Sequence, residues 1–215
     1  GWFGTLADIN NISMYKLRMI MQDNIVLTGT PADVSGTVFD LPLGWNWIGY
    51  TPQVSYDIND ALSNIPDGNA EYMKSQSGYA DYYSGFGWFG TLSTMSPFLG
   101  YQLSLTADTE FTYYDGEAFN AGSSNTAFSR SIDETESIDQ DVLAFNFHDY
   151  EFNGSMTVAL YNDEERIHSN DYVLAAFDGN QCVGYTKGLE LPLQLDPNNT
   201  MVFPLMVYGN EDNVQ

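Results

Sequence analysis

The sequence has one cysteine, six basic residues and no long apolar run. Cys182 has no partner for an intramolecular disulfide, which excludes a disulfide-rich scaffold without deciding the compartment. No stretch reaches the roughly 18 apolar residues of a membrane span, so membrane insertion is not expected. The chain starts at Gly1 and shows no basic region followed by an apolar one, so we interpret it as a mature or excised segment.

Basic residues are scarce against 29 acidic ones, which gives a formal net charge of −23. Such a surface repels phosphate backbones and anionic lipids, and we therefore expect no nucleic-acid partner. Three explanations of the acidity stay open at this point. They are Ca²⁺ sites, a salty environment that screens the repulsion, and plain solubility.

A catalytic motif is also missing. Cys182 could pair with His148 or His168 as nucleophile and base, but it lies in "QCVGY", a strand pattern in which a buried thiol is the ordinary interpretation. The two histidines do not form a zinc-ligand pattern. Acidic residues are so many that pairs of carboxylates are expected by chance. Such a pair is therefore no evidence for glycosidase activity. We expect no enzymatic activity.

What the sequence does contain is a repeat. The phrase "GWFGTL" occupies residues 1–6 and returns at 87–92, and Tyr15 and Leu17 recur as Tyr101 and Leu103. The alternation after each tyrosine has period two, which predicts a strand with one buried face. We interpret residues 1–30 as the closing half of a repeat and residues 31–118 as a complete aromatic β repeat.

The complete copy predicts several elements. "GWNWIGY" is a strand pattern, and "DINDALSN" predicts a short helix with Asp57 as its N-cap and Pro66-Asp67-Gly68 as its stop. Hairpin turns are predicted at Ser77-Gly78 and at Asp115-Gly116.

Residues 119–141 are small, polar and then acidic, and they predict a linker. Residues 142–215 form a second unit rich in strand patterns, with its clearest hairpin at Asp178-Gly179-Asn180. Pro204 in "MVFPLMVYGN" predicts an edge strand or a bulge. The fold class is therefore all-β, with one short helix in the first unit.

The phrases "LPLGWNWIGYTP", "MKSQSGYADYY" and "GWFGTLSTMSPFLGYQL" resemble a repeat of large secreted, multimodular surface proteins, chiefly of bacteria. The sequence departs from that repeat at Phe98-Leu99, where the family has a single Gly. Residues 142–215 resemble a module that often follows these repeats. The resemblance implies an immunoglobulin-like β-sandwich there, an extracellular or cell-surface location and no defined reaction.

Several acidic turns concentrate oxygen ligands of the kind that Ca²⁺ prefers. None of them matches a complete EF-hand loop, and Asp or Asn that hydrogen-bond their own turn are the competing interpretation. We expect a Ca²⁺ ion in at least one of these loops. The candidate ligands are Asp67, Asn69, Asp163, Glu165, Asp178 and Asn180.

The aromatic residues have two interpretations. They could form a platform on which sugar rings stack, or they could be the core of a small β unit. The repeat favours core packing, because the Trp of each "GWFGTL" copy would be needed for folding. The candidate platform residues are Trp45, Trp47, Trp88, Tyr82 and Tyr83.

The incomplete first copy presents an apolar face that includes Trp2, Leu6, Tyr15 and Leu17. The rest of the chain, a preceding module of a longer chain, or another copy in a strand-complemented filament could cover it. Asn11, Asn153 and Asn198 match weak glycosylation sequons. We expect a non-catalytic extracellular structural or adhesive protein that contacts its own copies or neighbouring modules, or alternatively a carbohydrate-binding module of a secreted enzyme.

Overall fold

The structure is a computed structural model that describes residues 5–19, 21, 26, 28–116, 140–198 and 200–211. The chain divides into two compact units. Unit 1 comprises Gly1–Ser75 and Tyr79–Phe128, and unit 2 comprises Gln76–Gly78 and Ser129–Gln215. Both are built of antiparallel strands, which confirms the all-β class. Within the described ranges, no helix has the length and apolar character needed to cross a membrane.

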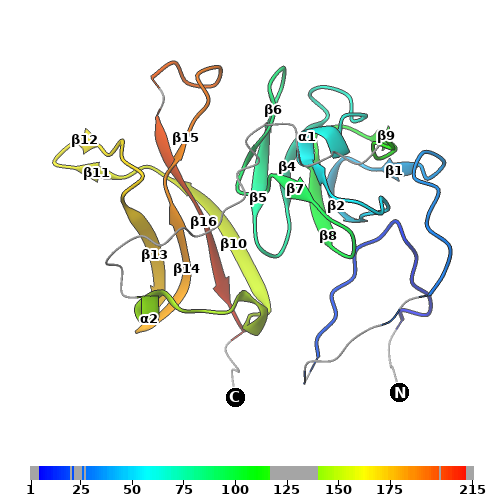
Figure 1. Ribbon diagram of the computed structural model, residues 1–215, viewed down its shortest axis with the longest axis horizontal. Helices are drawn as coiled ribbons and strands as arrows, with labels where there is room; N and C mark the ends of the chain where they lie inside the picture. Colours follow the sequence, from blue (N-terminus) through cyan, green and yellow to red (C-terminus); the bar gives the residue numbers. More distant parts are fainter. Residues whose placement is uncertain are drawn as a thin grey trace. The chain divides into compact units, whose positions relative to one another are not determined.

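Unit 1 is organised around a five-stranded antiparallel sheet in the order β2-β8-β4-β5-β6 (Figure 1). Two short strand pairs, β1-β9 and β3-β7, flank it. The elements in chain order are β1 (Phe39–Leu41), β2 (Gly44–Gly49), β3 (Tyr56–Asp57), α1 (Ile58–Ala61), β4 (Ala70–Lys74), β5 (Tyr79–Tyr83), β6 (Gly87–Gly90), β7 (Thr94–Met95), β8 (Gly100–Leu105) and β9 (Thr109–Phe111).

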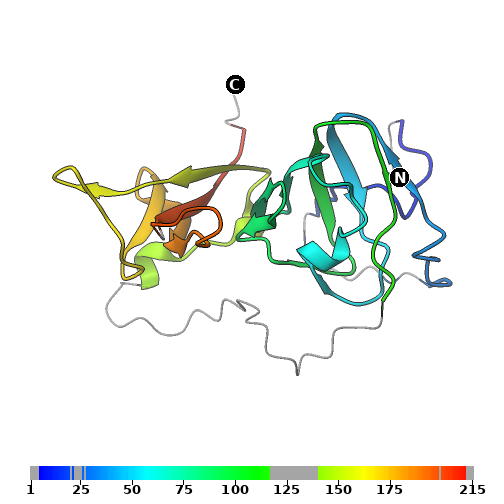
Figure 2. The same ribbon diagram turned by 90° about the horizontal axis from the view of Figure 1, so that it is seen from above.

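One face of this sheet forms the core of unit 1. Side chains alternate between the faces of a strand, so Tyr101, Leu103 and Leu105 of β8 all point inward, as the period-two pattern predicts. Helix α1 packs on this face through Ile58 and Ala61 (Figure 2). The core is unusually aromatic for its size, with the rings of Phe39, Phe111 and Tyr113 in mutual contact.

Helix α1 confirms the predicted short helix and its N-cap. The Asp57 carboxylate accepts a hydrogen bond from the Asn59 amide at 2.8 Å. The helix ends before the turn at Pro66-Asp67-Gly68, where Gly68 has φ +84°. The predicted hairpin at Ser77-Gly78 joins β4 to β5. The second strand proposed after Asp115-Gly116 lies outside the described residues.

The phrase "GWFGTL" at 87–92 is explained by its neighbours. Gly87 has φ +110°, and a Cβ there would collide with the Asn59 side chain. A Cβ on Gly90 would collide with the Tyr79 carbonyl. The Leu92 amide donates to that same carbonyl at 2.9 Å. Each required contact is therefore supplied by a residue that precedes the phrase in the chain.

The first copy has a different environment. Residues 12–14 add to the outer edge of β2: the Gly49 amide donates to the Ile12 carbonyl at 2.9 Å, and the Met14 amide to the Trp47 carbonyl at 3.2 Å. The Ser13–Ile48 bridge is isolated, and residues 15–19 form no strand. The segment is thus paired with its own chain, but without the sheet that surrounds the second copy. Trp2 lies outside the described residues.

Unit 2 contains a three-stranded sheet in the order β10-β16-β15 and two hairpins, β11-β12 and β13-β14. The predicted linker, residues 119–141, lies outside the described residues up to residue 139. The elements are α2 (Gln140–Leu143), η1 (Phe147–Asp149), β10 (Phe152–Val158), β11 (Tyr161–Asn162), β12 (Glu165–Arg166), β13 (Val173–Asp178), β14 (Gln181–Lys187), β15 (Leu189–Glu190) and β16 (Met201–Gly209).

Strand β16 is the centre of unit 2. Six consecutive residues from Met201 to Met206 are buried, and β14 approaches so closely that a Cβ on Gly184 would collide with the Met206 carbonyl. The prediction that Pro204 marks an edge strand or a bulge is wrong, because β16 is the middle strand of its sheet and Pro204 pairs in regular register with Thr157 of β10. Pro204 lies beyond the residues of β16 that pair with β15, so no ladder hydrogen bond is needed from it on that side. The hairpin turn at Gly179-Asn180 is confirmed. Immunoglobulin-like topology stays a prediction.

Candidate functional site

The candidate site is the outer face of the unit 1 sheet, opposite the core. Trp45 and Trp47 are two residues apart on β2 and therefore point to the same side. Their side chains are 57% and 48% exposed, respectively. Between them, Asn46 points inward and is buried. The expectation that these two tryptophans belong to the core is therefore wrong, and we call their surroundings the Trp45–Trp47 face.

The register of the sheet shows which residues share this face. Trp45 aligns with Ser104 on β8, which aligns with Tyr72 on β4 and then with Asp81 on β5. The Trp45 and Tyr72 rings meet edge-on, with centroids 5.7 Å apart. Tyr72 also stacks on Tyr79 at 5.6 Å. These contacts hold Trp45 at one end of a row of aromatic rings.

Trp47 has a different set of neighbours. It aligns with Gln102 on β8 and, one strand further, with Lys74 on β4. The Lys16 ammonium lies 5.5 Å from the centroid of the Trp47 ring, within the range of a cation–π interaction. Burial, together with the nearby charge of Lys16, lowers the pKa of Lys74. The Trp47 end of the face is therefore basic.

The Trp45 end is acidic. Glu71 lies at the register shift of β4, where its carboxylate accepts a hydrogen bond from the Ser104 hydroxyl at 3.0 Å. Burial raises the pKa of Asp81, and the charge of Glu71 adds to the effect. Tyr83 is two residues from Asp81 on the same face and is 37% exposed. Aromatic surface flanked by opposite charges can pack against a sugar ring while hydrogen-bonding its hydroxyls.

Two of the proposed platform residues lie elsewhere. Trp88 is 6% exposed within the core, as expected from the repeat, and its ring meets that of Tyr82 at 5.1 Å. The Tyr82 hydroxyl donates to the Asp67 carboxylate at 2.8 Å. Trp88 and Tyr82 thus face the core side, while Trp45, Trp47 and Tyr83 share the outer face. Lys16 and Lys74 were missed in the sequence, although the scarcity of basic residues could have drawn attention to them.

Two candidate Ca²⁺ ligands of unit 1, Asp67 and Asn69, make hydrogen bonds to other residues of the protein. Asp67 accepts from the Tyr82 hydroxyl, from the Ser84 hydroxyl at 2.9 Å and from the Gly85 amide at 3.0 Å, which lowers its pKa. Asn69 donates to the Thr109 hydroxyl at 3.1 Å. The Asp67 bonds tie the turn at residues 66–68 to β5 and to the loop that follows it, and the Asn69 bond ties it to β9.

The other proposed Ca²⁺ ligands lie in unit 2. Asp163 and Glu164 form the tight turn between β11 and β12, with φ values of +46° and +73°. Glu165 is the first residue of β12. Asp178 and Asn180 flank Gly179 in the β13-β14 turn. Among the residues that the structure describes, no group of three or more His, Cys, Asp or Glu side chains could hold a metal. Ca²⁺ binding stays a prediction.

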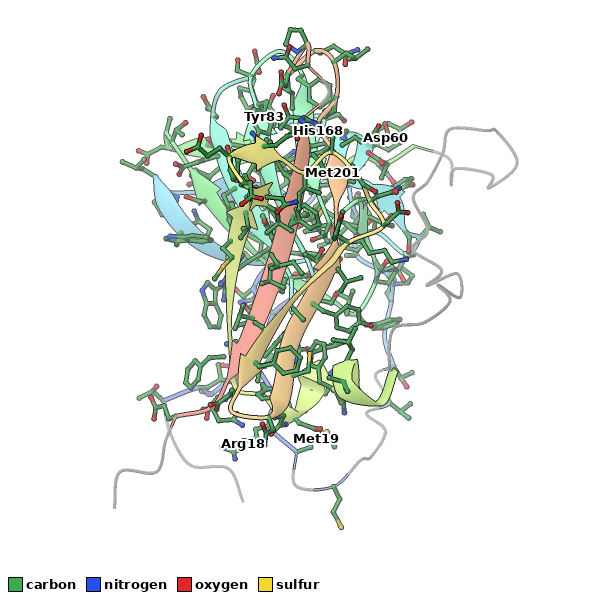
Figure 3. All side chains as sticks on the ribbon, turned by 90° about the vertical axis from the view of Figure 1, so that its left-hand side faces the viewer. Arg18, Met19, Asp60, Tyr83, His168 and Met201 are labelled. Atoms are coloured by element: carbon green, nitrogen blue, oxygen red, sulfur yellow. The ribbon has the colours of Figure 1, made fainter. Side chains whose placement is uncertain are left out.

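The proposed assembly residues are exposed where they are described. Leu6 is 64% exposed, Tyr15 38% and Leu17 49%. Arg18 and Met19 follow on the same segment (Figure 3). Their counterparts in the second copy, Leu92, Tyr101 and Leu103, are all buried. The same pattern therefore forms a core in one place and an exposed apolar segment in the other.

Cys182 is 2% exposed, and its Sγ lies 3.7 Å from the Gly184 carbonyl. In the part of the chain that is described, no hydrogen bond joins Cys182 to His148 or to His168, which follows β12 (Figure 3).

Of the three sequons, Asn11 and Asn198 are exposed, whereas Asn153 is half-buried on β10. Thr200 of the third sequon is 6% exposed, and its hydroxyl donates to Asp196.

A hollow of about 410 Å³ in unit 1 is lined by Tyr56 and by the loops at residues 32–34 and 52–54. The Asp33 carboxylate there accepts from the Gly36 amide of its own turn at 3.0 Å. The Tyr56 hydroxyl donates to the Gly116 carbonyl at 2.5 Å. None of the metal, carbohydrate or assembly residues proposed from the sequence lines this hollow.

Comparisons of the chain with protein-family models, with curated proteins and with solved structures found no significant match. The resemblance to secreted repeat proteins stays a prediction.

Proposed function

We propose that this chain is a non-catalytic, extracellular adhesive and structural protein that binds carbohydrate on the Trp45–Trp47 face. The observation that carries the proposal is the exposure of both indoles, 57% and 48%, on one side of β2. Large aromatic side chains are normally buried, and exposed ones grouped on a flat sheet mark interaction surfaces. The apolar face of a pyranose ring packs on an indole, and its hydroxyls need polar partners at the rim.

The rim of the face supplies such partners. Amide, ammonium and carboxylate groups lie on the strands next to the rings. They belong to Gln102, Lys74, Glu71 and Asp81. The rigid sheet holds the two indoles at a fixed separation, which limits the entropy lost on binding. An extracellular location fits the net charge of −23, because the surface repels nucleic acid and anionic membranes.

A binding assay tests this proposal. The full chain is titrated by calorimetry against a panel of neutral and charged oligosaccharides, beside the variants Trp45→Ala and Trp47→Ala. We expect micromolar to millimolar affinity for at least one glycan, and a loss of at least tenfold in each variant. Ser63→Ala, on the loop after α1, is the matched surface control and should bind normally. Equal binding by the tryptophan variants would contradict the proposal.

A second candidate function is assembly. The exposed segment at residues 5–19 carries the pattern that is buried in the second copy, and this contrast favours its burial against another module or another copy of the chain. Static light scattering on the 215-residue chain over a concentration series tests self-assembly. We expect reversible association that is weakened by Leu6→Ser and Leu17→Ser together, while a monomer at all concentrations would contradict it.

A further inference from the structure

The two copies of the repeat share a local hydrogen bond. In the second copy, the Ser96 amide donates to the Tyr101 hydroxyl at 2.7 Å. In the first copy, the Asn10 amide donates to the Tyr15 hydroxyl at 3.1 Å. The two pairs occupy corresponding positions of the aligned copies. Because Tyr101 is fully buried and Tyr15 is exposed, the bond belongs to the repeat itself and does not depend on a surrounding sheet.

Further bonds hold the first copy in place. The Asn10 side-chain oxygen accepts from the amides of Ile12 and Ser13, at 3.1 Å and 2.9 Å. Residues 12–14 are in turn bonded to the edge of β2. A segment that is ordered before it meets a partner loses less entropy on binding. Residues 5–19, which we call the closing segment, are therefore preorganised.

The closing segment exposes the side chains that the second copy buries. Five apolar positions of the second copy lie in the core of unit 1, and these are Leu92, Met95, Tyr101, Leu103 and Leu105. All five corresponding side chains of the first copy are exposed, and these are Leu6, Ile9, Tyr15, Leu17 and Met19. Apolar side chains grouped on an ordered, exposed backbone mark an interaction surface.

The second copy also shows what covers such a segment. Tyr101 aligns with Ile48 on β2, and Leu103 aligns with Met73 on β4. These partners come from residues 31–86, which we call the opening half of the repeat. The surface that complements the closing segment is therefore an opening half of the same pattern.

Charge favours the same partner. Arg18 corresponds to Ser104, whose hydroxyl donates to the Glu71 carboxylate at 3.0 Å. On a partner of the same pattern, the Arg18 guanidinium would meet that carboxylate and form a stronger, charge-assisted hydrogen bond. Arg18 makes a contact in the free chain, and this pair would replace it.

We propose that the closing segment binds a separate polypeptide that carries the opening half of this repeat without closing strands of its own. Residues 5–19 then take the place that residues 91–105 hold in unit 1. This inference rests on the proposed assembly function and specifies its partner. In a second copy of the chain that place is already filled, so a partner with an open half binds more tightly than the chain binds itself.

The experiment uses residues 31–86 as a fluorescently labelled probe, which is added to the full chain. The probe need not fold alone, because its ordering on the closing segment is part of the signal. Fluorescence anisotropy measures binding, and hydrogen exchange measures the protection of the amides of residues 15–19. A second probe carries Met73→Lys, which removes the apolar partner of the Leu103 position.

The test variant of the full chain is Leu6→Ser with Leu17→Ser. Leu43→Ser with Leu193→Ser is the matched control, because it changes two leucines that are also exposed. Melting curves establish that each variant is folded.

We expect the probe to bind the full chain and to protect residues 15–19. Binding should be at least about tenfold weaker in the test variant and with the Met73→Lys probe, because buried apolar surface is lost. The control should bind normally. Equal binding by the test variant, or binding without protection of residues 15–19, would overturn the inference. Self-association in light scattering without probe binding would overturn it and leave the assembly proposal standing, and absence of both would overturn both.

Discussion

Trp45 and Trp88 are the same residue type in opposite surroundings. Trp88 is enclosed by the core and contacts Tyr82, whereas Trp45 is more than half exposed on the other face of the same sheet. Trp45 lies on β2 and Trp88 on β6, and a shift of one residue in the register of either strand would move its tryptophan to the other face. We therefore expect Trp88 to contribute mainly to stability and Trp45 mainly to binding.

We predict that Trp88→Ala lowers the free energy of unfolding by about 3–5 kcal/mol, as loss of a buried aromatic does. Trp45→Ala should cost about 1 kcal/mol or less, because this ring is 57% exposed and meets Tyr72 edge-on. Urea denaturation followed by circular dichroism measures both values. A Trp88→Ala protein as stable as the unmodified one would contradict the assignment of Trp88 to the core.

The Asp67 carboxylate provides a pH-dependent contribution. Hydrogen bonds from Tyr82, Gly85 and Ser84 lower its pKa below the ordinary value of 3.8. A lowered folded-state pKa stabilises the fold above the unfolded-state pKa, and this stabilisation is lost as the pH falls through the folded-state value. We predict that Asp67→Asn is less stable than the unmodified chain at pH 7 and that the difference shrinks below about pH 4.

The control for this measurement is Asp40→Asn, which changes an exposed carboxylate on β1. Thermal melts of the three proteins from pH 2 to pH 7 give the comparison. A stability difference for Asp67→Asn that stays constant over this range would show that its charge is not involved.

At the scale of elements, the N-terminal segment depends on a glycine of β2. A Cβ on Gly49 would lie 2.6 Å from the Asn11 carbonyl oxygen, which belongs to the backbone and cannot rotate away. We predict that Gly49→Ala displaces residues 11–14 and exposes the amides of Met14 and residue 49 to hydrogen exchange. Gly154→Ala, where a Cβ meets no atom within 4 Å, is the control. Unchanged protection in Gly49→Ala would contradict the docking of this segment.

The elements also show what the sequence could predict. Period two in β8, the Asp57 cap and the Gly179-Asn180 turn are local signals, and the structure confirms each of them. The exposure of Trp45 and Trp47 depends on which face of β2 packs into the core, and no local pattern contains that information. The position of Lys16 depends on pairing between residues 12–14 and β2, which is equally non-local.

For the whole molecule, the net charge of −23 implies self-repulsion that salt should relieve. We predict that the melting temperature rises with NaCl concentration. If the acidic turns bind Ca²⁺, millimolar CaCl₂ should raise it further at matched ionic strength, by the linkage between ligand binding and folding. Equal midpoints in CaCl₂ and in chelator at matched ionic strength would contradict the calcium prediction.

We predict that glycans bind at Trp45 and Trp47 and leave the buried Trp88 untouched. The chain has four tryptophans, so its indole Nε1–H signals in a two-dimensional ¹H–¹⁵N spectrum are few and can be assigned by single Trp→Phe variants. Titration with the tightest-binding oligosaccharide should shift the Trp45 and Trp47 signals and leave that of Trp88 in place. Binding without a shift at Trp45 and Trp47, or with its largest shift at Trp88, would contradict carbohydrate binding on the Trp45–Trp47 face.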